Sequence, residues 1–391
     1  MEKVRLGDVA TIITKGTTPT SMGYDFVANG VNFIKIESIT EDGDFIKDKF
    51  AHITDECNEK LNRSKLQEND ILFSIAGAIG RVAIVDDSIL PANTNQALAI
   101  IRVPNGIYEY NFLKYILKSP VISKQFEKQK QGVAQINLSL KNISDFEIPV
   151  ISLEKQRQVS LVLDKVTDLI TKRKEQLKKI DALVKARFVE LFGTIHDNKF
   201  GYEIKTLQDV CEQIKDGTHQ TPTYTDDSVN GYMFLSSKDV TTGKIDWTHL
   251  KYIPEELHNE LYARIAPRKG DILLAKNGTT GIAAIVDREE VFDIYVSLAL
   301  LRPIEINSVY LWAAINSAET KQQFDSSLKG IGVPNLHLGE IKKARIIVPP
   351  VELQNQFAAF VEQTDKSKLE VQKSLEKLEL LKKALMQKYF G

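Results

Sequence analysis

The chain has 391 residues, of which 43% are hydrophobic and 26% are charged, as in an ordinary globular protein. Its 51 Lys and Arg residues nearly balance its 52 Asp and Glu residues, so net charge neither favours nor excludes a polyanionic partner. Two cysteines far apart in the sequence exclude a disulfide scaffold and a Cys-rich zinc site. The sequence shows no apolar signal or membrane segment, which predicts a soluble cytoplasmic protein, and its length predicts two or three domains.

Residues 1–150 predict a segment that mixes strands and helices. Three apolar runs have the length of a strand and are bounded mostly by Gly or Asp: DILFSIAG from Asp70, RVAIVDD from Arg81 and ALAIIRV from Ala97. Between Tyr108 and Pro120 the apolar residues recur at helical spacing, which predicts a helix there.

Residues 151–193 predict one long helix. Neither Gly nor Pro interrupts 153–192, and the apolar residues follow one another in steps of three, four or seven. At 1.5 Å per residue such a helix is roughly 60 Å long. A lone helix would leave its narrow apolar stripe exposed to water, so the helix needs a partner helix that covers the stripe. The expected core of that contact includes Leu163, Val166, Ile170, Leu177, Ile180 and Val184.

The second half of the chain repeats the first. Residues 271–287 (DILLAKNGTTGIAAIVD) match 70–86, Arg302 matches Arg102, and 335–391 match 137–193 without a gap. The second copy therefore predicts the same strands, a helix over 309–324, and a second long helix within 349–391. The stripe of this second long helix includes Val361, Val371, Leu375, Leu378 and Leu385.

This duplication predicts an α+β protein built from two tandem copies of one unit. The copies divide into α+β segments at 1–150 and 194–348, each followed by a long helix, at 151–193 and 349–391. Two copies related by a pseudo-twofold axis would pack their long helices as an antiparallel coiled coil. In the alternative arrangement, each helix packs only on its own α+β segment.

The sequence carries no recognisable catalytic motif. It has no P-loop, no Gly-rich nucleotide fingerprint and no Asn/Asp-Pro-Pro-aromatic run, and its six His residues lack metal-ligand spacing. We therefore expect no catalytic residue, no metal and no bound cofactor in this chain.

Four kinds of polar segment recur in both copies and are the candidates for ligand contact. The first is a pair of glycines between two strands, which permits a tight turn with positive φ or close approach to a phosphate. An ordinary hairpin turn is the alternative. The neighbours of these glycines are hydrogen-bonding residues suited to base edges or phosphate. The glycines and their neighbours are Ser74, Gly77, Gly80 and Arg81 in the first copy and Lys276, Asn277, Gly278, Thr279 and Gly281 in the second.

The other three kinds are loops or loop-like segments rich in hydroxyls, amides and cations. Lys15, Thr17, Lys215, Thr218 and His219 suit phosphate but also plain loop composition. Lys130, Gln131, Gln135, Asn137, Lys329, Asn335 and His337 suit bases or backbone, although Asn137 and Asn335 could instead be helix N-caps. Asn93, Asn95 and Gln96 can read adenine, whereas the second copy has Tyr295 there, as expected if the halves read different sequences or have simply drifted apart.

On these residues the whole chain resembles the specificity subunit of type I restriction–modification enzymes. The strand-Gly-strand pieces and the helix entry at Pro349, Pro350 and Gln354 carry the resemblance most clearly. The first copy has Ile151 and Ser152 in place of the two prolines but keeps Pro149 and Gln156, which leaves the start of its helix open.

The resemblance implies a non-catalytic DNA-binding subunit. Each α+β segment would be a target-recognition domain that reads one half of a bipartite double-stranded DNA sequence, and the coiled coil would set the gap. Two methyltransferase subunits, which bind S-adenosylmethionine, would dock on this chain. Translocase–nuclease restriction subunits would join them, and no membrane would be involved. One alternative is a non-catalytic coiled-coil scaffold that binds proteins, and another is an enzyme with an unrecognised site.

Overall fold

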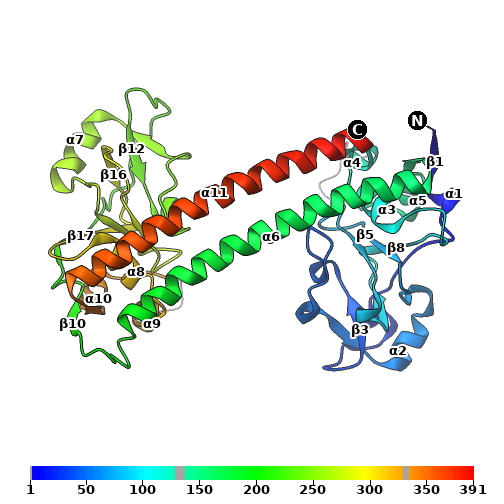
Figure 1. Cartoon of the computed structure of the whole chain (residues 1–391), viewed down its shortest axis with the longest axis horizontal. Helices are drawn as coiled ribbons and strands as arrows, with labels where there is room; N and C mark the ends of the chain where they lie inside the picture. The colour runs from blue at the N-terminus through cyan, green and yellow to red at the C-terminus, as the bar shows by residue number, and fades with distance from the viewer. Residues whose placement is uncertain (1, 128–136, 329–333) are drawn as a thin grey trace. The chain divides into compact units, whose positions relative to one another are not determined.

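The computed structural model describes residues 2–127, 137–328 and 334–391, and the chain divides into two compact units. Unit 1 comprises Met1–Lys174 with Lys373–Gly391, and unit 2 comprises Glu175–Gln372. Each unit therefore contains one α+β part together with portions of both long helices (Figure 1). Within the described ranges, no helix combines the length and apolarity needed to cross a membrane.

Unit 1 is built from three small sheets and five short helices beside its portions of the long helices. Its strands are β1 (Lys3–Arg5), β2 (Ile12–Lys15), β3 (Val31–Ile34), β4 (Ala51–Ile53), β5 (Ile71–Ser74), β6 (Val82–Ile84), β7 (Ala92–Thr94), β8 (Leu98–Arg102) and β9 (Glu147–Pro149). Its helices are α1 (Leu6–Val9), α2 (Asp55–Lys60), α3 (Tyr110–Leu117), α4 (Pro120–Glu127), α5 (Leu140–Ser144) and the first part of α6 (Leu153–Phe192). The sheet orders are β2-β8-β5-β6, β4-β3-β7 and β1-β9, and every pair is antiparallel except β3–β7.

Unit 2 repeats this topology strand for strand. Its strands are β10 (Glu203–Thr206), β11 (Cys211–Asp216), β12 (Tyr232–Leu235), β13 (Lys251–Ile253), β14 (Ile272–Ala275), β15 (Ala283–Ile285), β16 (Phe292–Ile294), β17 (Leu298–Pro303) and β18 (Arg345–Val348). Its helices are α7 (Glu255–Arg264), α8 (Ser308–Ile315), α9 (Ala318–Ser327), α10 (Leu338–Lys343) and the first part of α11 (Val351–Phe390). The sheet orders β11-β17-β14-β15, β13-β12-β16 and β10-β18 match those of unit 1, which confirms the predicted tandem α+β fold.

The central strands are apolar on both faces because each face packs against a different core. In β5, Ile71 and Phe73 belong to the core that includes α3, whereas Leu72 belongs to a second core on the other face. β14 divides its residues in the same way, with Ile272 on one face and Leu273 on the other. This double burial explains why these strands read as continuous apolar runs rather than as an alternation.

The helix predicted over 309–324 is wrong in one respect, because the structure divides it into α8 and α9. Asn316 and Ser317 lie between the two helices. The Ser317 hydroxyl accepts a hydrogen bond from the Thr320 backbone N–H at 3.2 Å, which starts a new helix. The Asn316 amide donates to the Ala283 backbone carbonyl at 3.0 Å, so the break also joins α8 to β15.

The long helices pair antiparallel in each unit. In unit 1, Val159 and Leu163 near the start of α6 share a core with Phe390 at the end of α11. In unit 2, Phe192 at the end of α6 shares a core with Phe357 near the start of α11. The beginning of one helix thus meets the end of the other, as predicted, and the alternative in which each helix packs only on its own segment is wrong.

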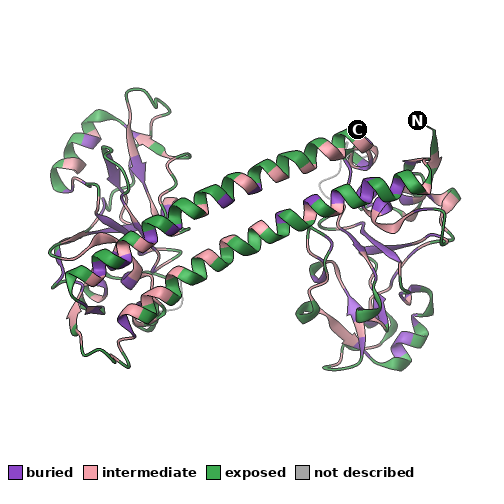
Figure 2. Ribbon diagram, viewed as in Figure 1, coloured by how far each residue is buried: buried purple, intermediate pink, exposed green. Residues whose placement is uncertain are grey.

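The residues expected in the helix–helix core face inward. Leu163, Val166, Ile170, Val361, Val371 and Leu375 are buried, and Leu177, Ile180, Val184, Leu378 and Leu385 are half-buried. Figure 2 shows buried and half-buried residues recurring along both long helices. Apolar residues off this stripe are exposed, among them Leu161, Leu183 and Leu369. In unit 2, Lys368 pairs with Asp181, and the Arg187 guanidinium lies 5.9 Å from the Phe360 ring centroid.

A buried glutamine fixes the start of each long helix to the α+β part beside it. The Gln354 amide donates to the Pro349 carbonyl at 2.8 Å and accepts from the Asn307 backbone N–H at 2.9 Å. Gln156 in unit 1 accepts from the Glu109 backbone N–H at 2.8 Å. Asn307 and Glu109 are the N-cap residues of α8 and α3, so the glutamine connects two helix starts.

Replacing Gln354 with alanine is expected to lower the free energy of unfolding of unit 2 by about 1–3 kcal/mol, because a buried N–H and a carbonyl lose their partner. Chemical denaturation measures the change. Gln356→Ala is the matched control, because Gln356 is exposed two residues further along α11, and it should change stability by less than about 0.5 kcal/mol. Equal effects of the two substitutions would contradict the role assigned to Gln354.

Candidate nucleic-acid interface

In unit 2 the predicted polar segments meet at one end of the four-stranded sheet. The Lys276 backbone N–H donates to the Ser297 carbonyl at 2.9 Å, and the Leu336 N–H donates to the Lys276 carbonyl at 2.7 Å. The Thr218 N–H donates to the Ile294 carbonyl at 3.1 Å. The segments around 218, 276, 295 and 336, far apart in the sequence, are therefore neighbours.

Unit 1 brings the matching segments together through the same kind of bonds. The Ile75 N–H donates to the Ala97 carbonyl at 2.9 Å, and the Leu138 N–H donates to the Ile75 carbonyl at 2.9 Å. The Gly16 N–H donates to the Asn95 carbonyl at 3.2 Å. Each unit thus gathers polar loops at one sheet end, which is the candidate nucleic-acid interface.

The paired glycines form the hairpin turn that joins β5 to β6 and β14 to β15. Their φ angles are positive, +67° at Gly77, +91° at Gly80, +75° at Gly278 and +80° at Gly281. A Cβ added at Gly278 would meet nothing within 4 Å, so conformation rather than crowding requires glycine there. The turn with positive φ is confirmed, and contact with a phosphate stays a prediction.

Three of the residues expected to contact DNA instead use their side chains in hydrogen bonds within the protein. The buried Ser74 hydroxyl donates to the Ala78 carbonyl at 2.6 Å, so it closes the turn. The half-buried Arg81 guanidinium donates to the Ile39 carbonyl at 2.8 Å. The buried Thr218 hydroxyl accepts from the Gln220 N–H at 3.2 Å.

Asn93 was also expected to read a base, and the structure corrects this prediction. Asn93 is 0% exposed. Its amide donates to the Asn58 side-chain oxygen at 2.9 Å, and its own side-chain oxygen accepts from the Ser64 hydroxyl at 2.7 Å. Because these polar atoms are satisfied inside the protein, Asn93 stabilises the fold of unit 1.

A buried His–Asp pair occupies the matching place in unit 2. His258 Nδ1 lies 2.7 Å from Asp293 Oδ2, and the Tyr232 ring stacks on His258 at a centroid distance of 3.7 Å. Burial raises the pKa of the Asp293 carboxyl to about 6, although the hydrogen bond and charge of His258 act in the opposite direction. The sequence pattern gave no signal for either residue, because the pair forms only when α7 packs on β16.

The remaining candidates differ in exposure. Gln96, Asn137, Lys215, His219, Thr279, Asn335 and His337 are exposed, and Lys15, Thr17, Asn95, Asn277 and Tyr295 are half-buried. Lys130, Gln131, Gln135 and Lys329 lie outside the described residues. The helix N-caps are Ser139 and His337, so the N-cap alternative for Asn137 and Asn335 is wrong.

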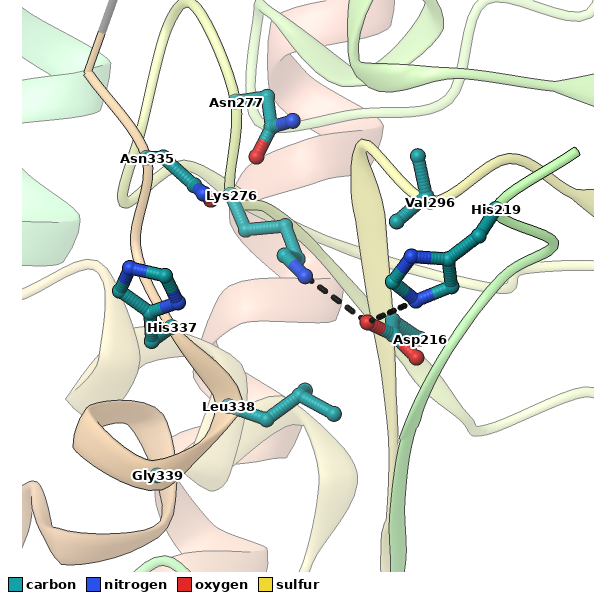
Figure 3. Close-up of a pocket in the computed structure, with 9 residues that line it drawn as sticks. All are labelled: Asp216, His219, Lys276, Asn277, Val296, Asn335, His337, Leu338 and Gly339. Atoms are coloured by element: carbon teal, nitrogen blue, oxygen red, sulfur yellow. Dashed lines mark hydrogen bonds and ion pairs between the residues drawn. The ribbon is translucent and has the colours of Figure 1, made fainter. Parts of the chain in front are cut away.

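Unit 2 carries an open pocket of about 510 Å³ among these loops. At its base the buried Lys276 ammonium lies 2.9 Å from Asp216 Oδ2, and His219 Nε2 lies 3.1 Å from the same oxygen. Figure 3 shows both side chains directed at Asp216, with Asn335 and His337 on the opposite wall. Burial favours the neutral Asp216 carboxyl, but Lys276 and His219 beside it lower its pKa below the ordinary value.

Asp216 was missed from sequence, although it stands directly between two residues of a predicted segment. A carboxylate before Gly and Thr reads as loop composition, and its partner Lys276 lies 60 residues further along the chain, directly after β14. Across the described residues, no three His, Cys, Asp or Glu side chains group closely enough to hold a metal ion.

A known protein family matches both copies of the repeated unit. The model of the type I restriction modification DNA specificity domain matches residues 1–180 and 200–380, once for each copy. The chain belongs to this family.

Relatives and solved structures of the type I specificity family extend the likeness over the full chain. The type I restriction enzyme MjaVIII specificity subunit of Methanocaldococcus jannaschii is 25% identical over 406 residues, which cover 98% of this chain and 91% of that protein. A chain from a structure of type I R-M complex assembly and conformational transition is 19% identical, with a TM-score of 0.63 and coverage of 100% and 97%. The type I S subunit from M. genitalium is 16% identical, with a TM-score of 0.54 and coverage of 100% and 96%. The two solved structures share the fold of this family.

Proposed function

We propose that this chain, as a DNA specificity subunit of a type I restriction–modification system, reads a bipartite target with its two α+β parts. The observation that carries the proposal is the repeated fold with changed polar tips. Both units bring matched loops to the same sheet end, and these loops present Asn95 and Gln96 in one unit but Tyr295 and Val296 in the other. A shared frame with different side chains suits two half-sequences that differ.

The long helices would determine the gap between the half-sequences. α6 and α11 each contribute residues to both units, so the same two helices connect the two readers. A 40-residue helix is roughly 60 Å long, and its length changes by about 6 Å with every four residues. The buried residues that recur along both helices would keep the two helices in register.

The chemistry would come from partners. Two methyltransferase subunits would supply S-adenosylmethionine and transfer its methyl group, and translocase–nuclease subunits would complete the restriction complex in the cytoplasm. This chain would select the DNA and contribute no catalytic residue. The coiled-coil scaffold that binds only proteins is not favoured, because the matched family is a DNA specificity domain.

Lengthening both helices tests the proposal. Inserting four residues after Leu177 in α6 and after Lys373 in α11 adds about 6 Å to each helix. At 3.4 Å per base pair, the unread gap should grow by one or two base pairs while both half-sequences stay the same. Methylation mapping in cells that express the chain with its methyltransferase partner gives all three quantities.

The control for this experiment changes the same surface without changing helix length. Lys178→Ala with Lys179→Ala replaces two exposed residues of α6 and should leave the gap unchanged. Altered half-sequences with an unchanged gap in the insertion variant would refute the spacer role. Binding that ignores DNA sequence in every variant would favour the protein scaffold instead.

A further inference from the structure

The turn after β14 carries an acceptor atom without a donor. Asn277 Oδ1 is buried, and no hydrogen-bond partner reaches it in the part of the chain that the structure describes. The backbone of Asn277 is fixed, because it forms an isolated bridge with Asn335. A buried, unpaired acceptor is unfavourable, so a ligand that offers an N–H donor is stabilised there.

The charge of the adjoining pocket selects against a phosphate. Its Lys276 ammonium is paired with Asp216, so the cation is neutralised by a carboxylate that also lines the pocket. A phosphate would meet this carboxylate as well as the ammonium. The amides of Asn277 and Asn335 and the His337 ring remain on the walls, and these groups suit a neutral polar ligand.

We propose that Asn277 reads an adenine in the half-sequence recognised by unit 2. In the major groove, adenine offers the N6 amino donor beside the N7 acceptor, and an asparagine amide matches both atoms at once. Asn277 Oδ1 accepts from N6 and Nδ2 donates to N7. The ion pair between the buried Lys276 and the half-buried Asp216 is the positioning element that holds the base of this turn. This inference rests on the proposed function.

Unit 1 has no counterpart of this reader. The β5 turn places Ile75 and Ala76 where the β14 turn has Lys276 and Asn277, and Lys15 stands where unit 2 has Asp216. The effect of changing Asn277 is therefore confined to one base pair of one half-sequence, while the half-sequence of unit 1 serves as an internal reference.

The test uses the full chain in complex with its methyltransferase partner. The probe is duplex DNA of the mapped bipartite sequence, in which each base pair of both halves is replaced in turn. Asn277→Ala should reduce discrimination roughly tenfold at one A·T pair of the second half. Asn277→Asp keeps an acceptor but loses the donor, so it should shift the preference at that pair from adenine toward cytosine, whose N4 amino group is a donor.

Glu290→Ala is the control, because Glu290 is exposed between β15 and β16 and belongs to none of the predicted polar segments, and it should leave the sequence preference unchanged. Thermal unfolding checks that the nearly isosteric Asp variant is folded. Wild-type discrimination in both Asn277 variants, or relaxed discrimination at a G·C pair, overturns the inference while the proposed function stands. The absence of any bipartite preference in the unsubstituted complex overturns the proposed function itself.

Discussion

Replacing Phe192 with alanine is expected to lower the free energy of unfolding of unit 2 by about 3–5 kcal/mol. Phe192 is 0% exposed at the end of α6. Its ring centroid lies 4.8 Å from that of Tyr310 and 5.5 Å from that of Phe357, in both cases edge to face. Alanine would leave a cavity among these rings, and the surrounding core could collapse into it only partly.

Both tryptophans of the chain, Trp247 and Trp312, lie in unit 2, so their fluorescence during chemical denaturation follows that unit. Phe192→Ala should move the fluorescence transition to lower denaturant. Phe390→Ala, which removes the ring 5.4 Å from Phe112 in unit 1, should move the circular dichroism transition but not the fluorescence transition. Val189→Ala, at an exposed site of α6, is the control. A Phe192→Ala effect no larger than that of the control would show that the end of α6 is not part of the unit 2 core.

His258→Ala is expected to cost about 3–5 kcal/mol at pH 7, because it breaks a buried pair and leaves the Asp293 carboxyl without its hydrogen-bond partner. Unit 1 suggests the compensating change, since Asn58 and Asn93 occupy the matching positions and are joined by a neutral hydrogen bond. The double variant His258→Asn with Asp293→Asn should therefore be markedly more stable than His258→Ala. A double variant that is no more stable would show that the surrounding residues, and not the pair, set the cost.

The same pair gives a pH dependence with a defined sign. Burial raises the pKa of Asp293 to about 6 from an ordinary value of 3.8, so the neutral carboxyl is the form that the fold favours. The stability that this group contributes is present below about pH 4 and is lost as pH rises through 6. Asp293→Asn stays neutral, so its stability relative to the unsubstituted chain should rise between pH 4 and pH 7. Tryptophan-monitored denaturation across this range measures the difference, and a constant difference would contradict the assignment.

The fold was largely predictable because its signals are local and occur twice. The uninterrupted stretch 153–192 predicted α6, and the repeated apolar runs predicted β5, β6 and β8 with their counterparts. The break between α8 and α9 escaped because Asn316 and Ser317 fit the apolar spacing around them. The cap formed by Ser317 and the bond from Asn316 to β15 mark the break in the structure.

The candidate site was predictable as a set of loops but not residue by residue. Hydrogen-bonding side chains mark a loop whether they face solvent or the interior, so Asn93 and Ser74 had the same composition signal as Gln96 and Thr279. Asp216 is the last residue of β11 and Lys276 directly follows β14, and only the pairing of these two strands with β17 brings them together. Side-chain direction is a tertiary property that spacing along one segment cannot supply.

The interleaving of the long helices has a consequence for how the chain is made. Unit 2 is contiguous in sequence, whereas unit 1 needs residues 373–391 to complete its core around Phe112 and Phe390. A ribosome delivers those residues only after the whole of unit 2 has been translated. The α+β part of unit 1 is synthesised first, and it therefore stays incompletely packed until the last segment of the chain has been made. During translation, unit 1 is the half of the chain most exposed to proteolysis and misassembly.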